Sequence, residues 1–233
     1  MDLIEPNFSF EDATWYGSIR ARVIELILKP RYEGRSEFKV LDYGSGNGET
    51  LKYLKQRINA DINFMGFDPN LFDRKYEGCG ISLVNDIKDL GNTKFDCVLL
   101  MDVLEHISSP SDVLVDAFSK LAPGGQLIIT VPAYRWAWSQ HDEALGHYDR
   151  YTKKRLTELV SQLSNVNRID TGYLFPTIFL LSMPFKIFKL SKNSLKASQK
   201  FAWILERIGK TEATFGTRSI FGISVISIVE RVN

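Results

Sequence analysis

Three glycines and two carboxylates in the first third of the chain have the types and spacing to hold a small ligand. Gly44, Gly46 and Gly48 alternate directly after a hydrophobic segment, and Asp42 precedes them. Glycine has no Cβ atom and therefore lets the backbone approach a ligand closely. Asp68 follows at the end of a second hydrophobic segment, where a carboxylate can accept hydrogen bonds from both hydroxyls of a ribose. The pattern predicts a site for a cofactor that contains a nucleoside.

The spacing of the glycines distinguishes between classes of nucleoside cofactor. A dinucleotide site needs Gly-x-Gly-x-x-Gly, whereas this chain has Gly44-x-Gly46-x-Gly48. Asp42 would repel a pyrophosphate but could accept a hydrogen bond from an ammonium group. We therefore expect a cofactor with an amino acid end, and a nicotinamide-dependent dehydrogenase is disfavoured.

The elements that must position these residues alternate between strand and helix from residue 38 to about 170. The apolar run 95–101 is typical of a central parallel strand that is covered on both faces, and β-branched residues predict another strand at 221–229. The alternation predicts a parallel sheet with helices on both faces. The segments that carry this prediction are strands 38–43, 63–68, 81–85, 95–101 and 126–131 and helices 49–58, 111–121 and 152–163, with Ser111 as a helix cap and 122–125 as a helix stop.

With five motifs in order over residues 38–132, the sequence resembles the class I S-adenosylmethionine-dependent methyltransferases. The resemblance implies a Rossmann-like α/β fold, with a mostly parallel seven-stranded sheet whose last strand is antiparallel. It also implies that the glycine turn holds the methionine part of the cofactor, that Asp68 holds the ribose and that Asp86 lies against the adenine. The cofactor-binding residues that we predict are Asp42, Gly44, Ser45, Gly46, Asn47, Gly48, Asp68, Pro69, Asp86, Ile87, Met101, Asp102 and Arg20.

Residues 138–152, WSQHDEALGHYDRYT, are similar to a bacterial subgroup of this family with a His-Asp…Gly-His…Arg-Tyr-Thr segment. Arg20, which follows an aromatic pair, also fits that subgroup, and it could clamp the cofactor carboxylate or form a surface salt bridge. The subgroup accompanies cell-envelope sugar and glycosyl-transfer functions. Asp149 departs from the subgroup, in which a basic residue is expected at this position.

All three histidines of the chain, His106, His141 and His147, follow the ends of predicted strands. The carboxyl ends of parallel strands line the ligand crevice of an open α/β sheet, and histidine is the natural base near neutral pH. We predict His141 or His106 as the base, with Asp142 beside it. Each of these residues also has an interpretation without a catalytic role. His106 could order the loop after the predicted strand 95–101, and His141 with Asp142 could form a local turn.

His147 is expected to order the corner at 148–151 rather than to remove a proton. A metal site from Glu105, His106, His141 and Asp142 is conceivable, but no ligand spacing supports it, so no metal is predicted.

Two flanking segments could cover an acceptor. We expect residues 1–233 to form one domain. Residues 8–29 should form a helix that leads into the first strand, and residues 171–215 should form an apolar and lysine-rich insertion. An apolar stretch beside five lysines suits contact with an anionic membrane surface, but an ordinary covering segment with a solvated lysine face is the favoured explanation. The lysines are Lys186, Lys189, Lys192, Lys196 and Lys200.

Composition narrows the class of function. The formal net charge is +1, so no global attraction to nucleic acid is expected. The N-terminus has no signal-peptide pattern, and a cytoplasmic setting is expected. The sequence thus predicts methyl transfer to a small molecule, most simply to a hydroxyl of a sugar or of a lipid-linked envelope or quinone-type precursor. The alternative is an inactive cofactor-binding partner of an envelope-biosynthesis assembly.

Overall fold

A single twisted sheet of eight strands organises the protein, in the order β3-β4-β2-β1-β5-β6-β8-β7. The computed structural model describes residues 14–58, 61–71, 75–78, 80–187, 202–214 and 219–233. Seven of the strands form the predicted Rossmann-like sheet, and β3 is an additional short strand at its edge. The strands are β1 (Phe38–Tyr43), β2 (Ile62–Phe67), β3 (Lys75–Gly78), β4 (Ile81–Val84), β5 (Phe95–Met101), β6 (Leu121–Pro132), β7 (Val166–Leu174) and β8 (Ser224–Arg231).

Strand directions confirm the predicted sheet. β1 pairs in parallel with β2 and with β5, and β5 pairs in parallel with β6. β8, the last strand of the chain, is antiparallel to both of its neighbours, β6 and β7. The antiparallel β3 lies against β4 at the opposite edge.

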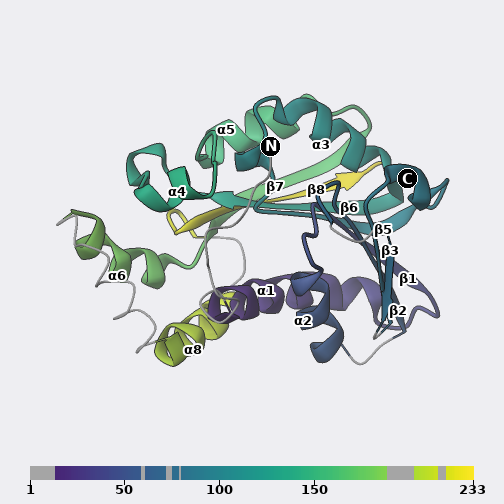
Figure 1. The fold of residues 1–233 in the computed structure, drawn as a ribbon, viewed down its shortest axis with the longest axis horizontal. Coiled ribbons are helices and arrows are strands. Elements are labelled where there is room, and N and C mark those ends of the chain that lie inside the picture. The colour runs from purple at the N-terminus through teal and green to yellow at the C-terminus, as the bar shows by residue number, and fades with distance from the viewer. Residues whose placement is uncertain (1–13, 59–60, 72–74, 79, 188–201, 215–218) are drawn as a thin grey trace.

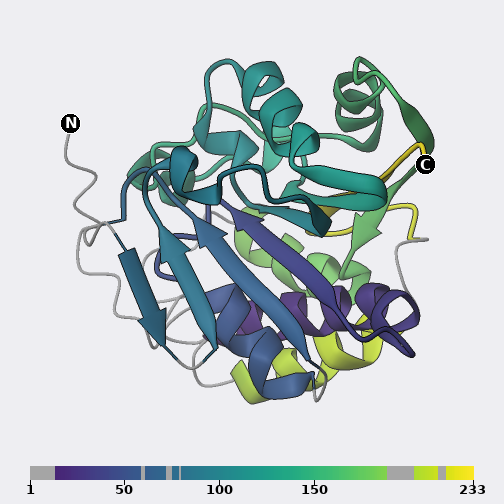
Figure 2. The same cartoon turned by 90° about the vertical axis from the view of Figure 1, so that its right-hand side faces the viewer.

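Helices cover both faces of the sheet (Figure 1). α1 (Thr14–Tyr32), α2 (Glu49–Arg57) and α8 (Ala202–Ala213) lie on one face, and α3 (Pro110–Ser119) and α5 (Lys153–Val160) lie on the other. Figure 2 shows β1 and β2 side by side with the first group of helices beneath them. The shorter helices are η1 (Ile87–Leu90), η2 (Leu104–His106), η3 (Arg135–Ala137) and α4 (Gln140–Ala144), and α6 (Pro176–Ile187) follows β7.

The two-residue period of the strands divides the apolar side chains between two cores. Val40 packs into the core beneath α1 and α2, whereas its neighbour Leu41 packs into the core beneath α3 and α5. Leu156 and Val160, four residues apart on α5, face the second core together.

The boundary between α3 and β6 differs from the prediction. α3 begins at Pro110, one residue before the predicted cap Ser111, because proline suits the first position of a helix. Residues 122–125, predicted as a helix stop, belong to β6. A Cβ atom on Gly125 would lie 2.9 Å from the carbonyl oxygen of Ala122, so glycine allows the backbone to fold closely there.

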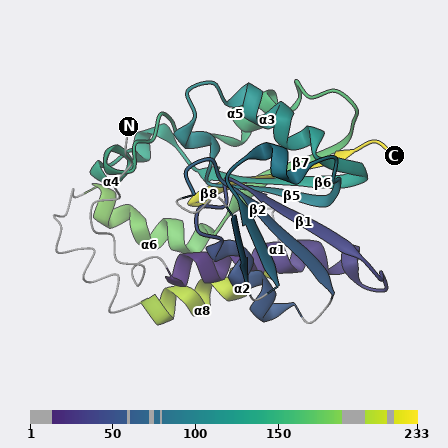
Figure 3. The same cartoon turned by 45° about the vertical axis from the view of Figure 1, so that its right-hand side comes forward.

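The parallel strands all point the same way, so their carboxyl ends lie together at one end of the sheet. The order of the strands along the chain reverses between β1 and its neighbours, since β1 lies between β2 and β5 (Figure 3). Such a switch point is where open α/β sheets bind ligands. Of the predicted covering segments, the described part of 8–29 is the helix α1, and 171–215 contains the end of β7, α6 and α8. Residues 188–201 lie outside the described part, with Lys189, Lys192, Lys196 and Lys200. Among the described helices, none is both long and apolar enough to cross a membrane.

Candidate functional site

The glycine turn connects β1 to α2 and is tied to the end of β2. The amides of Gly44 and Ser45 both donate to the carbonyl oxygen of Phe67, at 2.7 and 3.0 Å. The amide of Gly46 donates to Oδ2 of Asp68 at 2.8 Å, and the amide of Asn70 donates to Oδ1 at the same distance. Each Asp68 oxygen thus retains acceptor capacity for a ribose hydroxyl. The structure brings these two predicted motifs together.

The conformation of the turn requires glycine. Gly44, Gly46 and Gly48 have φ angles of +86°, +52° and +76°, which L-residues rarely adopt. A Cβ atom on Gly44 would lie 2.5 Å from Cγ2 of Val103, whereas one on Gly46 would have no neighbour within 4 Å. Gly46 therefore borders open space at the point where the cofactor is expected.

Two buried charged side chains beside the turn have atoms without a partner. Asp42 is 1% exposed, and neither of its carboxylate oxygens has a hydrogen-bond partner. Burial raises the pKa of Asp42 to about 7, opposed by the charge of Arg20. Arg20 on α1 forms an ion pair with Asp102 and lies over the Tyr16 ring, but its buried Nε is also unpartnered. An unpaired acid near an unpaired guanidinium nitrogen matches the ammonium and carboxylate of an amino acid, so these residues fit the methionine end of the cofactor.

The remaining predicted cofactor residues lie at the ends of β4 and β5 or near the turn. Asp86 caps η1, because its side chain accepts from the amide of Lys88 at 2.9 Å. Asp102 follows β5 with φ of +57°, and the hydroxyl of Thr130 donates to it at 3.1 Å. Met101 is buried, Ser45 and Ile87 are half-buried, and Asn47 and Pro69 are exposed.

A pair of imidazoles lies just past the end of β5. The ring centroids of His106, in η2, and His147 are 4.6 Å apart in an edge-to-face arrangement. Burial lowers the pKa of His106, and the charge of His147 acts in the same direction. His106 is therefore neutral at pH 7 and able to accept a proton or a ligand. His147 thus lies against His106, and its contact with Asp142, which also binds Arg150, is compatible with the expected role of ordering the corner at 148–151.

Asp142 holds His147 in place and is fully buried. Its Oδ1 lies 2.9 Å from Nδ1 of His147, and Arg150 donates to both of its oxygens, at 2.6 and 3.0 Å. Burial alone would raise the pKa of the Asp142 carboxyl, but hydrogen bonds from His147 and Arg150 hold it well below its usual range. Ser139 completes the set at the start of α4. This arrangement makes Asp142 a positioning residue.

His141, the other predicted base, is exposed on α4 next to Asp142. Burial of part of its ring lowers the pKa of the imidazole, opposed by the charge of Asp142. The structure therefore pairs His106 with His147 and places His141 outside that pair.

Glu105 completes a cluster that the sequence did not predict as a unit. It is 1% exposed, and its Oε2 has no hydrogen-bond partner. Burial raises the pKa of Glu105 well above its usual value, and the charge of Asp102 adds to the effect. Glu105, His106 and His147 each offer one donor atom within 4.8 Å of the others. The signal in the sequence that could have indicated an ordered His147 is its five-residue spacing from Asp142, because this spacing allows a local hydrogen bond between the two side chains.

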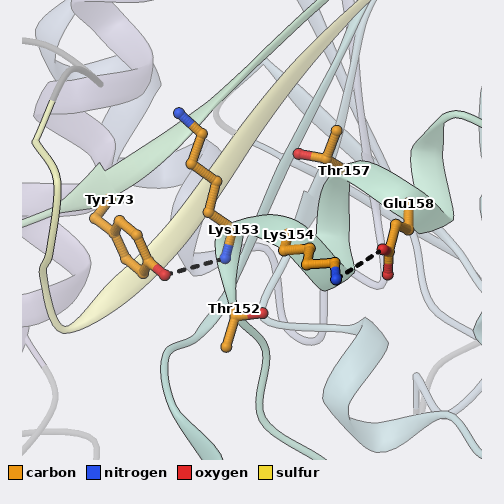
Figure 4. Close-up of a pocket in the computed structure, with 6 residues that line it drawn as sticks. All are labelled: Thr152, Lys153, Lys154, Thr157, Glu158 and Tyr173. Carbon is orange, nitrogen blue, oxygen red and sulfur yellow. Dashed lines mark hydrogen bonds and ion pairs between the residues drawn. The ribbon is translucent and has the colours of Figure 1, made fainter.

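A separate surface depression of about 520 Å³ lies between α5 and β7 (Figure 4). The amide of Lys153 donates to the hydroxyl of Tyr173 at 3.1 Å, and Lys154 pairs with Glu158 along the helix. No predicted site residue lines this depression. Its lining residues are Thr152, Lys153, Lys154, Thr157, Glu158 and Tyr173.

Comparison with known proteins places this geometry among methyltransferases. The sequence pattern of the methyltransferase-domain family matches residues 16–165, more than half of the chain. A ubiquinone biosynthesis O-methyltransferase from Parvibaculum lavamentivorans is 28% identical over 58% of this chain and 56% of its own length. A demethylmenaquinone methyltransferase from Tropheryma whipplei is 25% identical over 53% of each chain. A tRNA U34 carboxymethyltransferase from Nautilia profundicola is 30% identical over 53% of this chain and 42% of its own. The chain thus spans about half the length of the curated relatives it matches.

Solved structures share the fold. The plantazolicin methyltransferase BamL, in complex with a desmethylPZN analog and SAH, has a TM-score of 0.61 at 16% identity, covering 96% of this chain and 88% of that chain. Phosphoethanolamine N-methyltransferase 2 from Haemonchus contortus, in complex with S-adenosyl-L-methionine, has a TM-score of 0.54 at 13% identity, covering 97% and 59%.

Proposed function

We propose, since this chain belongs to the methyltransferase-domain family, that it transfers a methyl group from S-adenosylmethionine to a hydroxyl oxygen. S-adenosylmethionine is the cofactor of this family. The acceptor that we propose is small and largely apolar. The observation that carries the proposal is the unpaired, buried Asp42 and Arg20 Nε beside the open space at Gly46. Together with Asp68, these groups account for the amino acid and ribose parts of the cofactor.

The chain's own residues have two tasks, which are to bind the cofactor and to remove a proton from the acceptor. When bound, the cofactor supplies a methyl group on a sulfonium, which is activated for displacement by an acceptor oxygen. The protein must orient that oxygen and lower the cost of removing its proton. The cluster of Glu105, His106 and His147 is the group of titratable side chains that we assign to the proton, and His141 stays a second candidate for the base.

An apolar acceptor is supported by the side chains that follow β6. Tyr134 stacks on Tyr173 and on Trp136, with ring centroids 5.3 and 5.6 Å apart, and Phe179 of α6 packs against Tyr134 at 5.3 Å. Such a surface suits a ring or an acyl chain. Two of the curated relatives are named for ubiquinone and menaquinone chemistry, which supports a quinone-type precursor as the first acceptor class to test.

Isothermal titration with S-adenosylhomocysteine tests the cofactor site. We expect one binding site per chain in the wild type, strongly weakened binding in Asp68→Ala, and unchanged binding in Asp61→Ala, where the replaced aspartate is exposed and lies before β2. Absence of binding to the folded wild type would refute the proposal. Methyl transfer to hydroxylated quinone precursors is then measured by release of S-adenosylhomocysteine. Binding without transfer to any hydroxyl, thiol or amine acceptor would favour an inactive cofactor-binding partner.

A further inference from the structure

We propose that Glu105, His106 and His147 bind a divalent transition-metal ion at the acceptor side of the site. Two imidazoles and one carboxylate with open positions are a recurrent ligand set for such ions. The three donor atoms already lie within 4.8 Å of one another. Glu105 has a buried oxygen with no protein partner, which is the kind of atom that a bound cation would satisfy.

Both imidazoles are held in a form that leaves a donor nitrogen for an ion. Nδ1 of His147 faces the carboxylate of Asp142 at 2.9 Å, so its Nε2 is directed away from that carboxylate. His106 forms a hydrogen bond with the backbone oxygen of Leu145. Metal-binding histidines usually engage a carboxylate or a backbone carbonyl through the nitrogen that does not bind the metal.

The backbone fixes the three ligands relative to one another. Glu105 and His106 are adjacent in η2, immediately after β5. The amide of Tyr148 donates to the carbonyl oxygen of Glu105 at 2.6 Å, and the amide of His147 donates to that of Asp142 at 2.9 Å. The loop that carries His147 is thereby attached to η2 without the help of an ion.

The ligand chemistry selects the kind of ion. Imidazole nitrogen suits Zn²⁺, Fe²⁺ or Co²⁺, whereas Mg²⁺ and Ca²⁺ prefer oxygen ligands. Three protein ligands leave at least one position for an acceptor oxygen. An acceptor hydroxyl bound there would lose its proton more easily. With the ion bound, His106 and His147 act as ligands and not as the base, so the proton passes to water or to His141. The resulting oxygen would attack the methyl carbon as the bond from that carbon to sulfur breaks. This role for the ion rests on the proposed function, but the binding of the ion does not.

Titration of tag-free, chelator-treated protein with ZnCl₂ alone tests the proposal, with MgCl₂ as a parallel titrant and Co²⁺ absorption as a probe of imidazole ligation. We expect one Zn²⁺ per chain, far weaker Mg²⁺ binding, and loss of at least about tenfold in Zn²⁺ affinity in Glu105→Gln and in His106→Asn. His141→Asn removes an exposed imidazole outside the cluster and should leave Zn²⁺ affinity unchanged. Asp142→Asn leaves all three ligands in place but alters the hydrogen-bond partner of His147 as well as the pairing with Arg150, and it should weaken Zn²⁺ binding by about 10- to 100-fold.

Circular dichroism of the metal-free variants shows whether each one is folded, and two ligand substitutions are used because one of them could fail to fold. Absence of Zn²⁺ binding to the wild type would overturn the proposal, as would equal affinity in the wild type, Glu105→Gln and His106→Asn. Titration with S-adenosylhomocysteine is measured separately, so failure of the metal site and failure of the cofactor site are distinguishable.

Discussion

Gly46 differs from another open, left-handed glycine, Gly34, in lying in the turn that we expect to hold the cofactor. Gly46 and Gly34 both have positive φ, +52° and +78°, and neither would bring a Cβ atom within 4 Å of a neighbour. Replacing either by alanine should cost roughly 1–2 kcal/mol of stability from the backbone alone. Only Gly46→Ala should also weaken S-adenosylhomocysteine binding, by at least about tenfold, or about 1.4 kcal/mol. Calorimetric titration of both variants would contradict this if Gly34→Ala lost as much affinity.

Asp42 predicts a dependence on pH with a definite sign. Its pKa in the folded protein is about 7, above its usual value because of burial, so the folded state binds more protons than the unfolded state between about pH 4 and 7. The cofactor-free wild type should therefore lose stability relative to Asp42→Asn as the pH rises through this range. The loss in the free energy of unfolding of the wild type relative to Asp42→Asn should reach a few kcal/mol above pH 7, since each unit of pKa shift corresponds to about 1.4 kcal/mol.

Cofactor binding should respond in the opposite direction, because the ionised Asp42 attracts an ammonium group. Between pH 5.5 and 7.5, the affinity of the wild type for S-adenosylhomocysteine should rise, and that of Asp42→Asn should stay flat. Thermal unfolding and calorimetry at several pH values measure both effects. A parallel pH profile in the variant would show that Asp42 does not meet the cofactor.

Local spacing was sufficient to predict the glycine turn and Asp68, because both lie directly at strand ends. It was not sufficient for the imidazoles. His141 and His147 are six residues apart in the same loop, and only tertiary contacts with Arg150 and η2 decide that His147, and not His141, lies against His106. The spacing from Asp142 to His147 is compatible with a local hydrogen bond, but spacing carries no information on the contact with η2.

At the scale of elements, the corner from α4 to α5 depends on one buried carboxylate. Asp142→Asn leaves the Arg150 guanidinium without its charge partner, which should cost about 3–5 kcal/mol. Asp149→Asn is the matched control in the same loop. The partners of Asp149, Arg135 and Arg155, are exposed, and the expected loss is below about 1 kcal/mol.

Urea unfolding of both variants at neutral and acidic pH measures the difference. The pKa of Asp142 is held below its usual range, so its contribution is present above about pH 4 and is lost as the pH falls further. The gap between the wild type and Asp142→Asn should therefore narrow in acid. Equal stability losses in the two variants at pH 7 would show that the corner does not depend on Asp142.

Elements with a strong apolar pattern were predictable, and those set by pairing were not. β5 is buried along nearly its whole length and reads as a strand from composition alone. β7 has two exposed polar residues, Asn167 and Arg168, directly after its first residue, and only its pairing with β8 makes that stretch a strand. The early start of β6 likewise depends on its pairing with β5 and on the tight packing at Gly125.

At the scale of the whole molecule, exposed apolar residues gather beside the acceptor side of the sheet. Trp136 is 59% exposed and Ile220 86% exposed. Phe179 lies between the two segments that carry them, since its ring contacts those of Trp136 and of Phe221, the residue after Ile220. An acceptor with a long apolar tail would be held in a membrane, and a protein that uses it would need to contact the membrane surface through such residues.

We therefore expect the full chain to float with anionic phospholipid vesicles in a density gradient. The basic residues of the sequence between 186 and 200 predict that neutral vesicles bind less of it. Trp136→Ser combined with Ile220→Ser should reduce the floated fraction several-fold. Val115→Ser is the matched control, because Val115 is also apolar and is 57% exposed, but belongs to a different element, α3. The expectation would be contradicted by equal flotation of the wild type, the double variant and Val115→Ser, or by no flotation of the wild type. Residues 171–215 would then only cover the acceptor, and the acceptor would reach the site from solution.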